Sequence, residues 1–426
     1  MQLKLCAAQG RGTFGAQKPL VVQPLSEPHS FHRMNCVARF LSLLACLLTA
    51  SWCAPPPGVR VSMAHNNSGP FPYSHNSNFA VTPAGRLAVV YQASSQHEGA
   101  TDMSIFIVFS SDAGLTWTAP TRLAGNGSHA EWGPVLAADA ERGLLHLFYA
   151  ESGSPPTSLC GDIYGQVSRD DGSSWEPRTL VLPTSSWGGC AKCPDNQVVR
   201  QPSGGWALPF FSAQLSGQTG RVGAGLVASP AGGSGPWSLL NGSVTLPTNA
   251  SYYYEPAVAQ CGPPPSTRLL MLLRSQVGIL FASTSTNGGG AWGAPMGTGL
   301  PNPNSKVNLA TWTAGATAGS GSGGGLEPGD ILLAYNPTNC SSSWCPRSPL
   351  GVSVSQDCGS SWSPPLLIEP KDGGKTFSYP TIDRCGPDTL CMVYTYLVPD
   401  SEGGVNASGI RFVSFPTAML GVGRLH

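Results

Sequence analysis

The stretch SSDAGLTW, from Ser110 to Trp117, decides the fold because the chain repeats it. Further copies are SRDDGSSW at Ser168 to Trp175, STNGGGAW at Ser285 to Trp292, SQDCGSSW at Ser355 to Trp362, and a weaker, one-residue-longer SPAGGSGPW at Ser229 to Trp237. We call this pattern, Ser-x-Asp-x-Gly-x-x-Trp, the turn motif. In the copy at Ser285 to Trp292, Asn287 replaces the Asp. A period of roughly 60 residues exceeds the common helical repeats and favours a four-stranded sheet repeated around an axis.

The residues of the turn motif suit a hairpin turn. Apolar runs precede the copies, as Ile105, Ile107 and Phe109 do for the first, and proline and another apolar stretch follow, so each copy is expected to join two strands. Asp or Asn accepts hydrogen bonds from nearby backbone N–H groups, Gly permits positive φ, and Trp wedges against a neighbouring sheet. We therefore expect the motif carboxylates to hold turns and not to catalyse; they are Asp112, Asp170 and Asp357.

Length and composition agree with one large all-β domain. The chain has 426 residues, of which 11% are charged, and Lys plus Arg balance Asp plus Glu at 23 each. At about 60 residues per unit, residues 60–415 accommodate six units, so we predict an all-β, six-bladed β-propeller. No basic stripe indicates a nucleic-acid partner.

The amino terminus is typical of a secretory signal. Arg33 and Arg39 precede an apolar run from Phe40 to Trp52, which is too short to span a bilayer and is followed by small residues and prolines. We interpret residues 1–55 as an extension plus signal peptide, without a stable membrane span, and residues 1–33 as either an unusual extension or a mis-started reading frame. Six Asn-x-Ser sequons also favour a secreted or lumenal glycoprotein; they are Asn66, Asn126, Asn241, Asn249, Asn339 and Asn406.

Nine cysteines follow the predicted signal, and several flank short loops. The pairs expected from this spacing are Cys385 with Cys391, Cys340 with Cys345, and Cys160 with either Cys190 or Cys193. The only C-x-x-C, Cys190 to Cys193, lacks a second pair, so no metal site is expected. The glycine-rich run from Gly319 to Gly325 is not followed by the lysine of a phosphate loop and indicates a surface insertion, so we expect no cofactor.

The turn motifs and the segments between them resemble the sialidase (neuraminidase) superfamily, in its branch of BNR-repeat-like proteins, over about residues 65–415. The segments that carry the resemblance are HNSNFAVTPAGRLAVV (75–90), EGATDMSIFI (98–107), WGPVL (132–136), EPAVAQCGPPPSTRLLMLLR (255–274), LPNPNSKVN (300–308), RSPL (347–350) and SYPTI (378–382). The resemblance implies an exo-glycosidase that removes a terminal acidic sugar from a glycan or glycoconjugate.

The chemistry of that reaction dictates residue types. Guanidinium groups clamp a planar carboxylate through paired hydrogen bonds. In sialidases a Tyr activated by a Glu base is the nucleophile and an Asp is the acid/base. The resemblance implies these roles for Tyr379 as nucleophile, Glu255 as its base, Asp102 as acid/base with Glu98 as the alternative acid and a substrate-binding residue, and Arg274 and Arg347 as clamp arginines.

The chain departs from the family pattern at two positions. The first clamp arginine is replaced by His75 within Tyr73-Ser74-His75-Asn76, and the carboxylate that supports it falls near Tyr394 and Thr395. Loss of both members together indicates a coordinated change, and a His is a shorter, often neutral donor. The anion site is therefore expected to be weaker, or to accept a different acidic or a neutral sugar. We also expect Trp132 and Asn196 to line sugar subsites.

The sequence thus predicts a secreted, exo-α-sialidase-like glycosidase without cofactors. Two alternatives keep the same scaffold. One is a non-catalytic carbohydrate-binding propeller, which the loss of the first arginine favours. The other is a polysaccharide lyase or another glycosidase, because a fold does not fix its chemistry. The sequence leaves the sugar, the linkage and the oligomeric state open.

Overall fold

The computed structural model describes residues 55–67, 69–187, 191–213, 223–230, 232–245, 255–263, 265–313, 325–340, 346–372, 374–399 and 405–421, with the side chains of 213, 399 and 405–408 left out. The chain divides into two compact units, Met1–Ser51 and Trp52–His426, and all described residues belong to the second. The predicted signal peptide, Cys190, Cys345 and the glycine-rich run before Gly325 lie outside the described residues.

The described residues form strands and two short 3₁₀ turns, η1 (Gly232–Ser234) and η2 (Thr417–Leu420), which confirms the prediction of an all-β fold. Three antiparallel sheets follow the chain without crossovers: β2 (Tyr73–Val81), β3 (Leu87–Ser94), β4 (Ser104–Ser110), β5 (Thr121–Ala124); β15 (Ala257–Gln260), β16 (Leu269–Leu273), β17 (Ile279–Ser285), β18 (Met296–Pro301); β19 (Asn308–Thr311), β20 (Ile331–Tyr335), β21 (Leu350–Ser355), β22 (Leu366–Glu369).

A fourth sheet joins the two ends of the described region. Its strands are ordered β1-β25-β24-β23, with bounds β1 (Arg60–His65), β23 (Thr376–Gly386), β24 (Thr389–Pro399) and β25 (Val405–Pro416). The first strand therefore pairs with the last, in a register that sets Val61 opposite Val413. This pairing removes an exposed edge from each of them.

The remaining sheet has nine strands, so the connectivity does not establish six separate blades. Its members are β6 (Glu131–Asp139), β7 (Leu144–Ser152), β8 (Gly161–Ser168), β9 (Thr179–Leu182), β10 (Ala191–Pro194), β11 (Val199–Arg200), β12 (Trp206–Ala213), β13 (Gly223–Ser229) and β14 (Ser238–Val244). Among the described residues, the strand pairing that joins β6–β9 to β10–β14 is that of β8 with β10, at Gly161 and Lys192.

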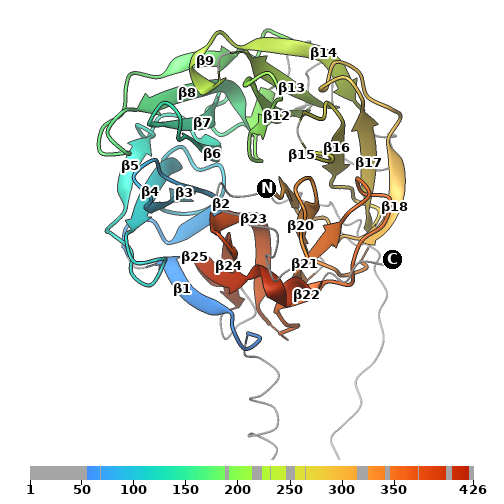
Figure 1. Cartoon of the computed structure of the whole chain (residues 1–426). Helices are drawn as coiled ribbons and strands as arrows, with labels where there is room; N and C mark the ends of the chain where they lie inside the picture. Colours follow the sequence, from blue (N-terminus) through green and yellow to red (C-terminus); the bar gives the residue numbers. More distant parts are fainter. Residues whose placement is uncertain are drawn as a thin grey trace, which may run out of the picture. The chain divides into compact units, whose positions relative to one another are not determined.

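Figure 1 shows the sheets of residues 52–426 following one another around a common centre, with early strands of the sheets facing inward. Strand β2 contacts β6 and β23, and β19 contacts β15 and β23. The first strands of different sheets are therefore neighbours although they are far apart in the sequence. Their starting ends bring loops of several sheets together.

The apolar core lies between neighbouring sheets, because the strands are apolar on both faces. One cluster joins β2–β5 to β6–β8 through side chains such as Ile107 and Leu147, and another joins β15–β17 to β19 and β20 through Leu270 and Leu333. Burial of such side chains contributes about 1.5–3 kcal/mol each. Every sheet is thus held by the two beside it.

The turn motifs adopt the predicted structure. Each of the four full copies links the third strand of a group to the fourth, as Ser110 to Trp117 links β4 to β5. In this first copy Asp112 Oδ1 accepts bonds from the Ser110 hydroxyl (2.7 Å) and the Thr116 N–H (2.9 Å). Gly114 has a φ of +86°, and a Cβ there would lie 2.2 Å from the Phe412 ring, so only glycine fits. The turn-holding role expected for Asp112 agrees with these bonds.

Disulfides connect both near and distant segments. Cys385–Cys391 confirms one predicted pair, and Cys160–Cys193 selects one of the two partners left open. It spans the junction between β8 and β10. The pairing of Cys340 with Cys345 involves a residue outside the described ones.

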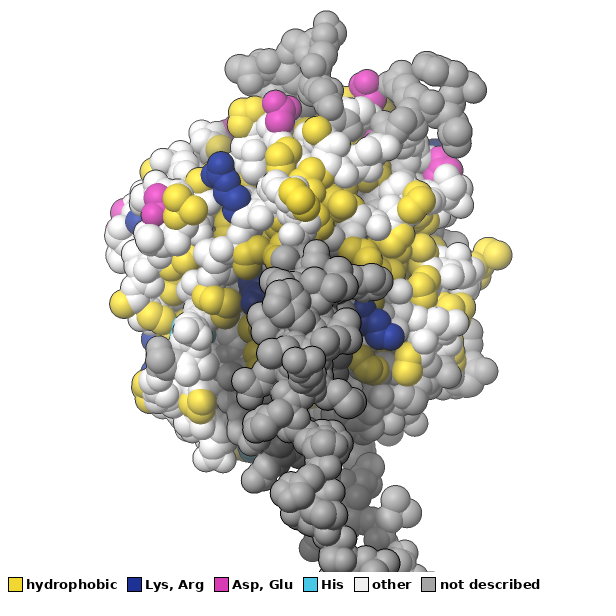
Figure 2. All heavy atoms as spheres, turned by 90° about the horizontal axis from the view of Figure 1, so that it is seen from below, with side chains coloured by type: hydrophobic (Ala, Val, Ile, Leu, Met, Phe, Trp, Pro, Cys, Tyr) yellow, Lys and Arg dark blue, Asp and Glu magenta, His cyan; other side chains and the backbone are white. Residues whose placement is uncertain are grey.

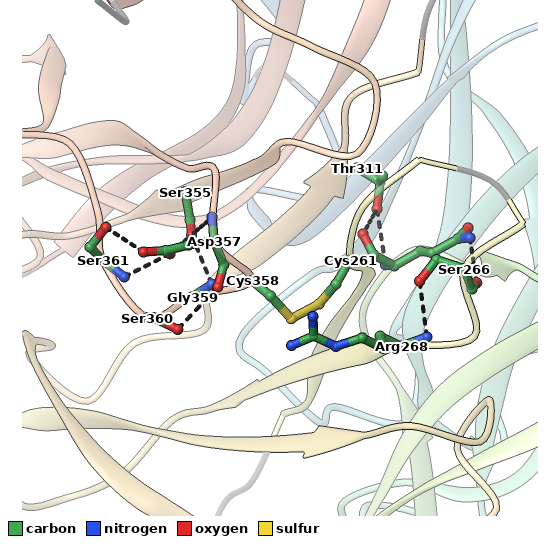
Figure 3. The surroundings of a disulfide bond; sticks show 11 residues. Cys261, Ser266, Arg268, Thr311, Ser355, Asp357, Cys358, Gly359, Ser360 and Ser361 are labelled. Carbon is green, nitrogen blue, oxygen red and sulfur yellow. Dashed lines mark hydrogen bonds between the residues drawn. A yellow bond between two sulfur atoms is a disulfide. The ribbon is translucent and has the colours of Figure 1, made fainter. Parts of the chain in front are cut away.

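A third disulfide, Cys261–Cys358, was not expected from the sequence because 97 residues separate the two cysteines. Figure 3 shows it between the end of β15 and the turn motif that follows β21. Asp357 in that motif accepts a bond from the Ser361 N–H at 2.8 Å. The bridge therefore ties one sheet to the turn of the next.

Few charged side chains are visible among the described residues on the face shown in Figure 2. On the face in Figure 2, charged side chains are scattered among apolar and uncharged ones and form no continuous patch of one sign. Within the described part of the chain, no helix has the length and hydrophobicity needed to cross a membrane.

Candidate active site at the starts of the first strands

Four residues at or near the starts of first strands have left-handed backbone conformations. They are Asn76 in β2 (φ 49°), Glu255 before β15 (φ 33°), Asn304 before β19 (φ 54°) and Tyr379 in β23 (φ 57°). The ladder of β2 shifts register at Asn76 and that of β23 shifts at Tyr379. Such backbone costs about 1–3 kcal/mol per residue and is found at functional sites. Here it re-aims side chains away from the regular alternation of the strands.

Tyr379, Glu255 and Arg274 form a closed triangle of hydrogen bonds. The Tyr379 hydroxyl donates to Glu255 Oε1 (2.6 Å), and Arg274 Nη1 donates both to Glu255 Oε2 (2.7 Å) and to the Tyr379 oxygen (2.7 Å). All three side chains are buried. Burial raises the pKa of Tyr379 well above its usual range, although Arg274 opposes that shift. The phenol is therefore protonated at rest and its proton points at a carboxylate.

Arg347 lies on another side of the same phenol. Its guanidinium carbon is 5.3 Å from the centre of the Tyr379 ring, and its Nη2 donates to the Asn304 carbonyl at 3.0 Å. The Asn304 side chain in turn accepts from Arg274 Nε at 2.7 Å. The Arg347 side chain makes no other hydrogen bond among the described residues, and the residue is half-buried. Its remaining N–H groups are therefore available to a ligand.

His75 also contacts Tyr379, and its partner is the residue near which the supporting carboxylate was expected. The His75 and Tyr379 ring centres are 4.2 Å apart, and His75 Nδ1 lies 2.9 Å from Thr395 Oγ1. Thr395 Oγ1 also accepts the Asn76 N–H at 3.2 Å. Burial lowers the pKa of His75 well below its usual value, and the charge of Arg347 adds to this. A neutral His–Thr pair thus stands where the sequence resemblance implied an arginine and a supporting carboxylate.

Of the two acids considered for proton transfer, Glu98 is the one coupled to this cluster. Gln92, paired opposite His75, donates to Glu98 Oε1 at 3.2 Å, and its own oxygen accepts the Gly133 N–H at 3.0 Å. Desolvation raises the pKa of Glu98; Arg347 opposes this shift and Glu255 adds to it. The Glu98 surface is nevertheless exposed, so the carboxyl lies at the solvent-facing edge of a crowded site.

Asp102 accepts a hydrogen bond within its own loop, between β3 and β4. One of its oxygens accepts the Ser95 N–H at 3.1 Å, and the other is buried without a partner among the described residues. No described contact joins Asp102 to Tyr379, Glu255 or an arginine of the cluster. Within the described residues Glu98 also makes no hydrogen bond to these side chains, and its link to the cluster runs through Gln92 and through the charges of Arg347 and Glu255.

Sequence reasoning missed two buried ionisable residues beside the cluster, Lys306 and Asp195. Lys306 Nζ lies 5.7 Å from the Tyr379 ring centre and donates to the Asp195 carbonyl at 2.7 Å, while Asp195 Oδ1 accepts the Asn76 amide at 2.6 Å. Burial lowers the pKa of Lys306 and raises that of Asp195. Lys306 belongs to the segment 300–308 that carries the family resemblance, but no pattern in that segment predicts its position against the Tyr379 ring.

Trp132 and Asn196 make structural contacts. The Trp132 indole N–H donates to the Ser152 hydroxyl at 2.8 Å, and its ring packs on Gly99 of the loop that carries Glu98. Asn196 donates to the Pro256 carbonyl at 3.0 Å and accepts from Asn308 at 3.0 Å, which links the segment after β10 to the start of β15 and to β19. Both are buried, and neither makes a recorded contact with Tyr379.

The cluster contains the groups that covalent transfer needs at a carbon atom next to a negatively charged group. It offers a phenol with a carboxylate acceptor for its proton, two guanidinium groups, and a further carboxyl with a raised pKa at the edge. No cluster of three or more metal-ligating side chains occurs within the described residues.

Comparisons with known proteins agree with this picture at the level of the fold. The family model of the BNR repeat-like domain matches residues 85–390. A comparison with curated protein sequences finds no significant match.

Several solved structures are similar. A Hadza microbial sialidase gives a TM-score of 0.61 at 16% identity, over 80% of this chain and 65% of that one. NanB sialidase from Streptococcus pneumoniae, in complex with 2-[(3-chlorobenzyl)ammonio]ethanesulfonate, gives 0.64 at 12%, over 83% and 70%. A leech intramolecular trans-sialidase with 2,7-anhydro-Neu5Ac gives 0.62 at 12%, over 82% and 69%. At these identities the likeness extends to a sialidase-like fold.

Proposed function

We propose that this chain, which belongs to the BNR repeat-like domain family, is a sialidase-like exo-glycosidase. Its candidate site holds a phenol between a carboxylate and a guanidinium. Its substrate is a glycan or glycoconjugate that ends in an acidic sugar, sialic acid or a relative of it. The observation that carries the proposal is the Tyr379 hydroxyl bonded to both Glu255 (2.6 Å) and Arg274 (2.7 Å).

In the proposed reaction Tyr379 is the nucleophile. Its oxygen forms a bond to the anomeric carbon as the bond to the leaving oxygen breaks, and its proton passes to Glu255. The leaving oxygen takes a proton from the acid/base. Water then attacks the anomeric carbon, gives a proton to that acid/base, and releases Tyr379, which recovers its proton from Glu255. A neutral phenol approaches the anionic sugar without the repulsion that a carboxylate nucleophile would meet.

The acid/base is Asp102 by the family pattern or Glu98 by its contacts. A raised pKa keeps a carboxyl protonated nearer to neutral pH, as a general acid requires, and this favours Glu98. Arg274 and Arg347 hold the substrate carboxylate. His75 contributes a neutral donor in place of a third guanidinium, so we expect weaker binding of the carboxylate.

We further propose that the fold is a six-bladed propeller, in which β6–β9 and β10–β14 are two blades. The described strand pairing between them is one residue pair of β8 with β10, and the turn motif after β8 precedes the fourth strand of the first unit. The chain is proposed to be secreted or lumenal, on the strength of its predicted signal and its sequons.

A second candidate function is a carbohydrate-binding propeller without catalysis. The contact between His75 and Thr395 favours it, because both members of the first arginine's ion pair are replaced together. In that case the cluster would retain a sugar acid without cleaving it.

Replacement of Tyr379 by Phe tests the proposal. Turnover of a fluorogenic sialoside is expected to fall by at least about 10³-fold, because the covalent route is lost, while binding of the acidic sugar persists. The matched control is Tyr91→Phe, since the Tyr91 hydroxyl is buried without a partner among the described residues. If the unaltered protein binds acidic sugars but cleaves none of a panel of them, the binding function replaces the enzymatic one.

A further inference from the structure

Tyr73 is a tyrosine of the first-strand end that has no part in the reaction proposed above. It begins β2, two residues before His75, and the regular pairing of β2 with β3 sets Tyr73 opposite Ser94 and His75 opposite Gln92. Side chains two positions apart in a strand point to the same face of the sheet. Tyr73 therefore lies on the face that carries His75, and the centres of the two rings are 6.2 Å apart.

The loop that carries Glu98 is fixed on the same face. Ser94 and Gln92 lie on it, because residues directly opposite each other in antiparallel strands share a face. The Ser94 hydroxyl donates to the His97 carbonyl at 2.7 Å, and the Gln92 amide donates to Glu98 Oε1 at 3.2 Å. Tyr73 and Glu98 therefore lie on the same side of β2 and β3.

The Tyr73 hydroxyl is a donor without an acceptor in the described part of the protein. The residue is half-buried, its oxygen makes no hydrogen bond to a described residue, and it is not one of the polar atoms that are buried without a partner, so solvent reaches it. Burial raises the pKa of Tyr73 well above its usual value; Glu98 and Tyr379 add to this shift and Arg347 opposes it. The hydroxyl is therefore protonated at neutral pH and can donate to a ligand.

His75 offers a second neutral donor beside Tyr73. The hydroxyl oxygen of Thr395 accepts the Asn76 N–H, and the acceptor for its own proton among the described residues is His75 Nδ1, at 2.9 Å. The proton of the neutral imidazole is then on Nε2. This nitrogen makes no hydrogen bond to a described residue and is not one of the buried unpaired atoms, so a ligand can reach it as well.

These two donors lie close to a clamp arginine. Arg347 interacts electrostatically with both Tyr73 and His75, and it has N–H groups that bond no described residue. An anion with several oxygens can accept from a guanidinium and from neutral O–H and N–H donors at the same time. The carboxylate of an acidic sugar is such a group.

We propose that the Tyr73 hydroxyl donates to the carboxylate of the sugar and, together with His75 Nε2, replaces the donors of the absent first clamp arginine. The inference rests on the proposed function, because it adds a contact to the same group of the same substrate. It makes Tyr73 a substrate-binding residue and gives it no role in bond breaking. The carboxyl of Glu98 is an alternative acceptor, but no hydrogen bond joins it to Tyr73 among the described residues.

Isothermal titration calorimetry of the full chain with a thioglycoside of sialic acid, whose C–S bond resists hydrolysis, tests the proposal. Tyr73→Phe is expected to raise Kd about tenfold (~1.4 kcal/mol), because a hydrogen bond to a charged group is lost. The melting temperature should not change, since the hydroxyl bonds no described residue.

The matched control is Tyr164→Phe. Tyr164 is also half-buried, and its hydroxyl makes no hydrogen bond to a described residue. Its ring packs against Arg178 and Tyr149 instead of the Tyr379 cluster, at 4.0 Å from the guanidinium carbon and 6.2 Å between ring centres. Tyr164→Phe should therefore bind the thioglycoside with the Kd of the unaltered protein.

A carbon-13 label at the carboxylate carbon of the ligand separates direct contact from packing. Its resonance in the bound state should move in Tyr73→Phe and stay in place in Tyr164→Phe, because loss of a donor changes the shielding of the carboxylate. A weaker Kd without this movement would assign Tyr73 to packing, and an unchanged Kd would show that the hydroxyl does not touch the ligand. Either result overturns the proposal.

The same measurements distinguish this inference from the proposed hydrolase function. If the unaltered protein does not bind the thioglycoside, both are wrong. If it binds with the Tyr73 effects described but cleaves no O-linked sialoside, the Tyr73 contact is supported and the hydrolase function is wrong. Cleavage of sialosides by the unaltered protein, with an unchanged Kd in Tyr73→Phe, would support the function and overturn the contact.

Discussion

Ionisable side chains at the two ends of the repeated sheets have pKa shifts of opposite direction. Strands alternate in direction, so the turn after the third strand of a sheet lies at the opposite end from the start of its first strand. At the turn end, donors from its own loop, chiefly Thr116, lower the pKa of Asp112 to about 2. At the first-strand end, desolvation raises the pKa of Glu98 and of Tyr379.

The difference lies in where the partners come from. Asp112 is satisfied by Ser110 and Thr116, within four residues of it, whereas Tyr379 meets Glu255 across 124 residues of sequence. A local turn needs only its own segment to be correct. The first-strand end needs several sheets in position, and it leaves groups such as Arg347 with hydrogen-bonding capacity for a ligand.

The largest effect that would sharpen this comparison concerns the two acids of the β3–β4 loop. If Glu98 is the acid/base, Glu98→Gln should lower kcat on sialosides with poor leaving groups by about 10²–10⁴-fold. Asp102→Asn should then change kcat by less than about tenfold. The reverse order would assign the acid/base to Asp102, and the pH profile of kcat/KM, measured for both variants, would show which one loses its acidic limb.

A second, smaller effect on KM is expected from the neutral His75–Thr395 pair. We expect His75→Arg together with Thr395→Glu to lower KM for an acidic sugar by about tenfold, because a guanidinium adds a charged hydrogen bond to the carboxylate. His75→Arg alone should destabilise the fold, since Thr395 cannot balance a buried charge. Melting temperatures and KM values of the two single variants and the double variant form the cycle. If the double variant gains no affinity, the sugar does not place its carboxylate beside His75.

The smallest effect on activity is expected at the turn end. Asp112→Ala should lower the melting temperature by a few degrees and leave kcat/KM unchanged, because it removes the acceptor of the Ser110 and Thr116 bonds. The chain supplies the control: Asn287 accepts the equivalent bonds from Ser285 (2.9 Å) and the Ala291 N–H (2.8 Å), so Asp112→Asn should be milder. A large loss of activity in Asp112→Ala, with the fold intact, would break the distinction between the two ends.

The contribution of Asp112 to stability at the turn end is expected to decrease as the pH falls. The pKa of Asp112 is lowered from 3.8 to about 2 in the folded protein, so its stabilising contribution is present above about pH 4 and is lost as pH falls towards 2. Melting curves between pH 5 and pH 2 should therefore fall more steeply for the unaltered protein than for Asp112→Asn.

The sequence predicted most of the chemistry of the central cluster but not its geometry. Family resemblance pointed to Tyr379, Glu255 and the two clamp arginines, and the structure brings these side chains together. It could not indicate Lys306 beneath the phenol, since no local pattern distinguishes that lysine from a surface one. Nor could it separate Glu98 from Asp102, four residues apart in one loop, because their difference depends on Gln92 in the strand before.

The sequence by itself determined the repeated strand–turn–strand unit, because each turn motif supplies its own donors, acceptors and glycine within eight residues. It also determined the Cys385–Cys391 bridge, whose cysteines flank one turn. Only the tertiary structure decided the contacts between units, such as Cys261 with Cys358 and His75 with Thr395, 97 and 320 residues apart. Local patterns fix what one segment can satisfy alone; bonds between distant segments depend on how the sheets pack.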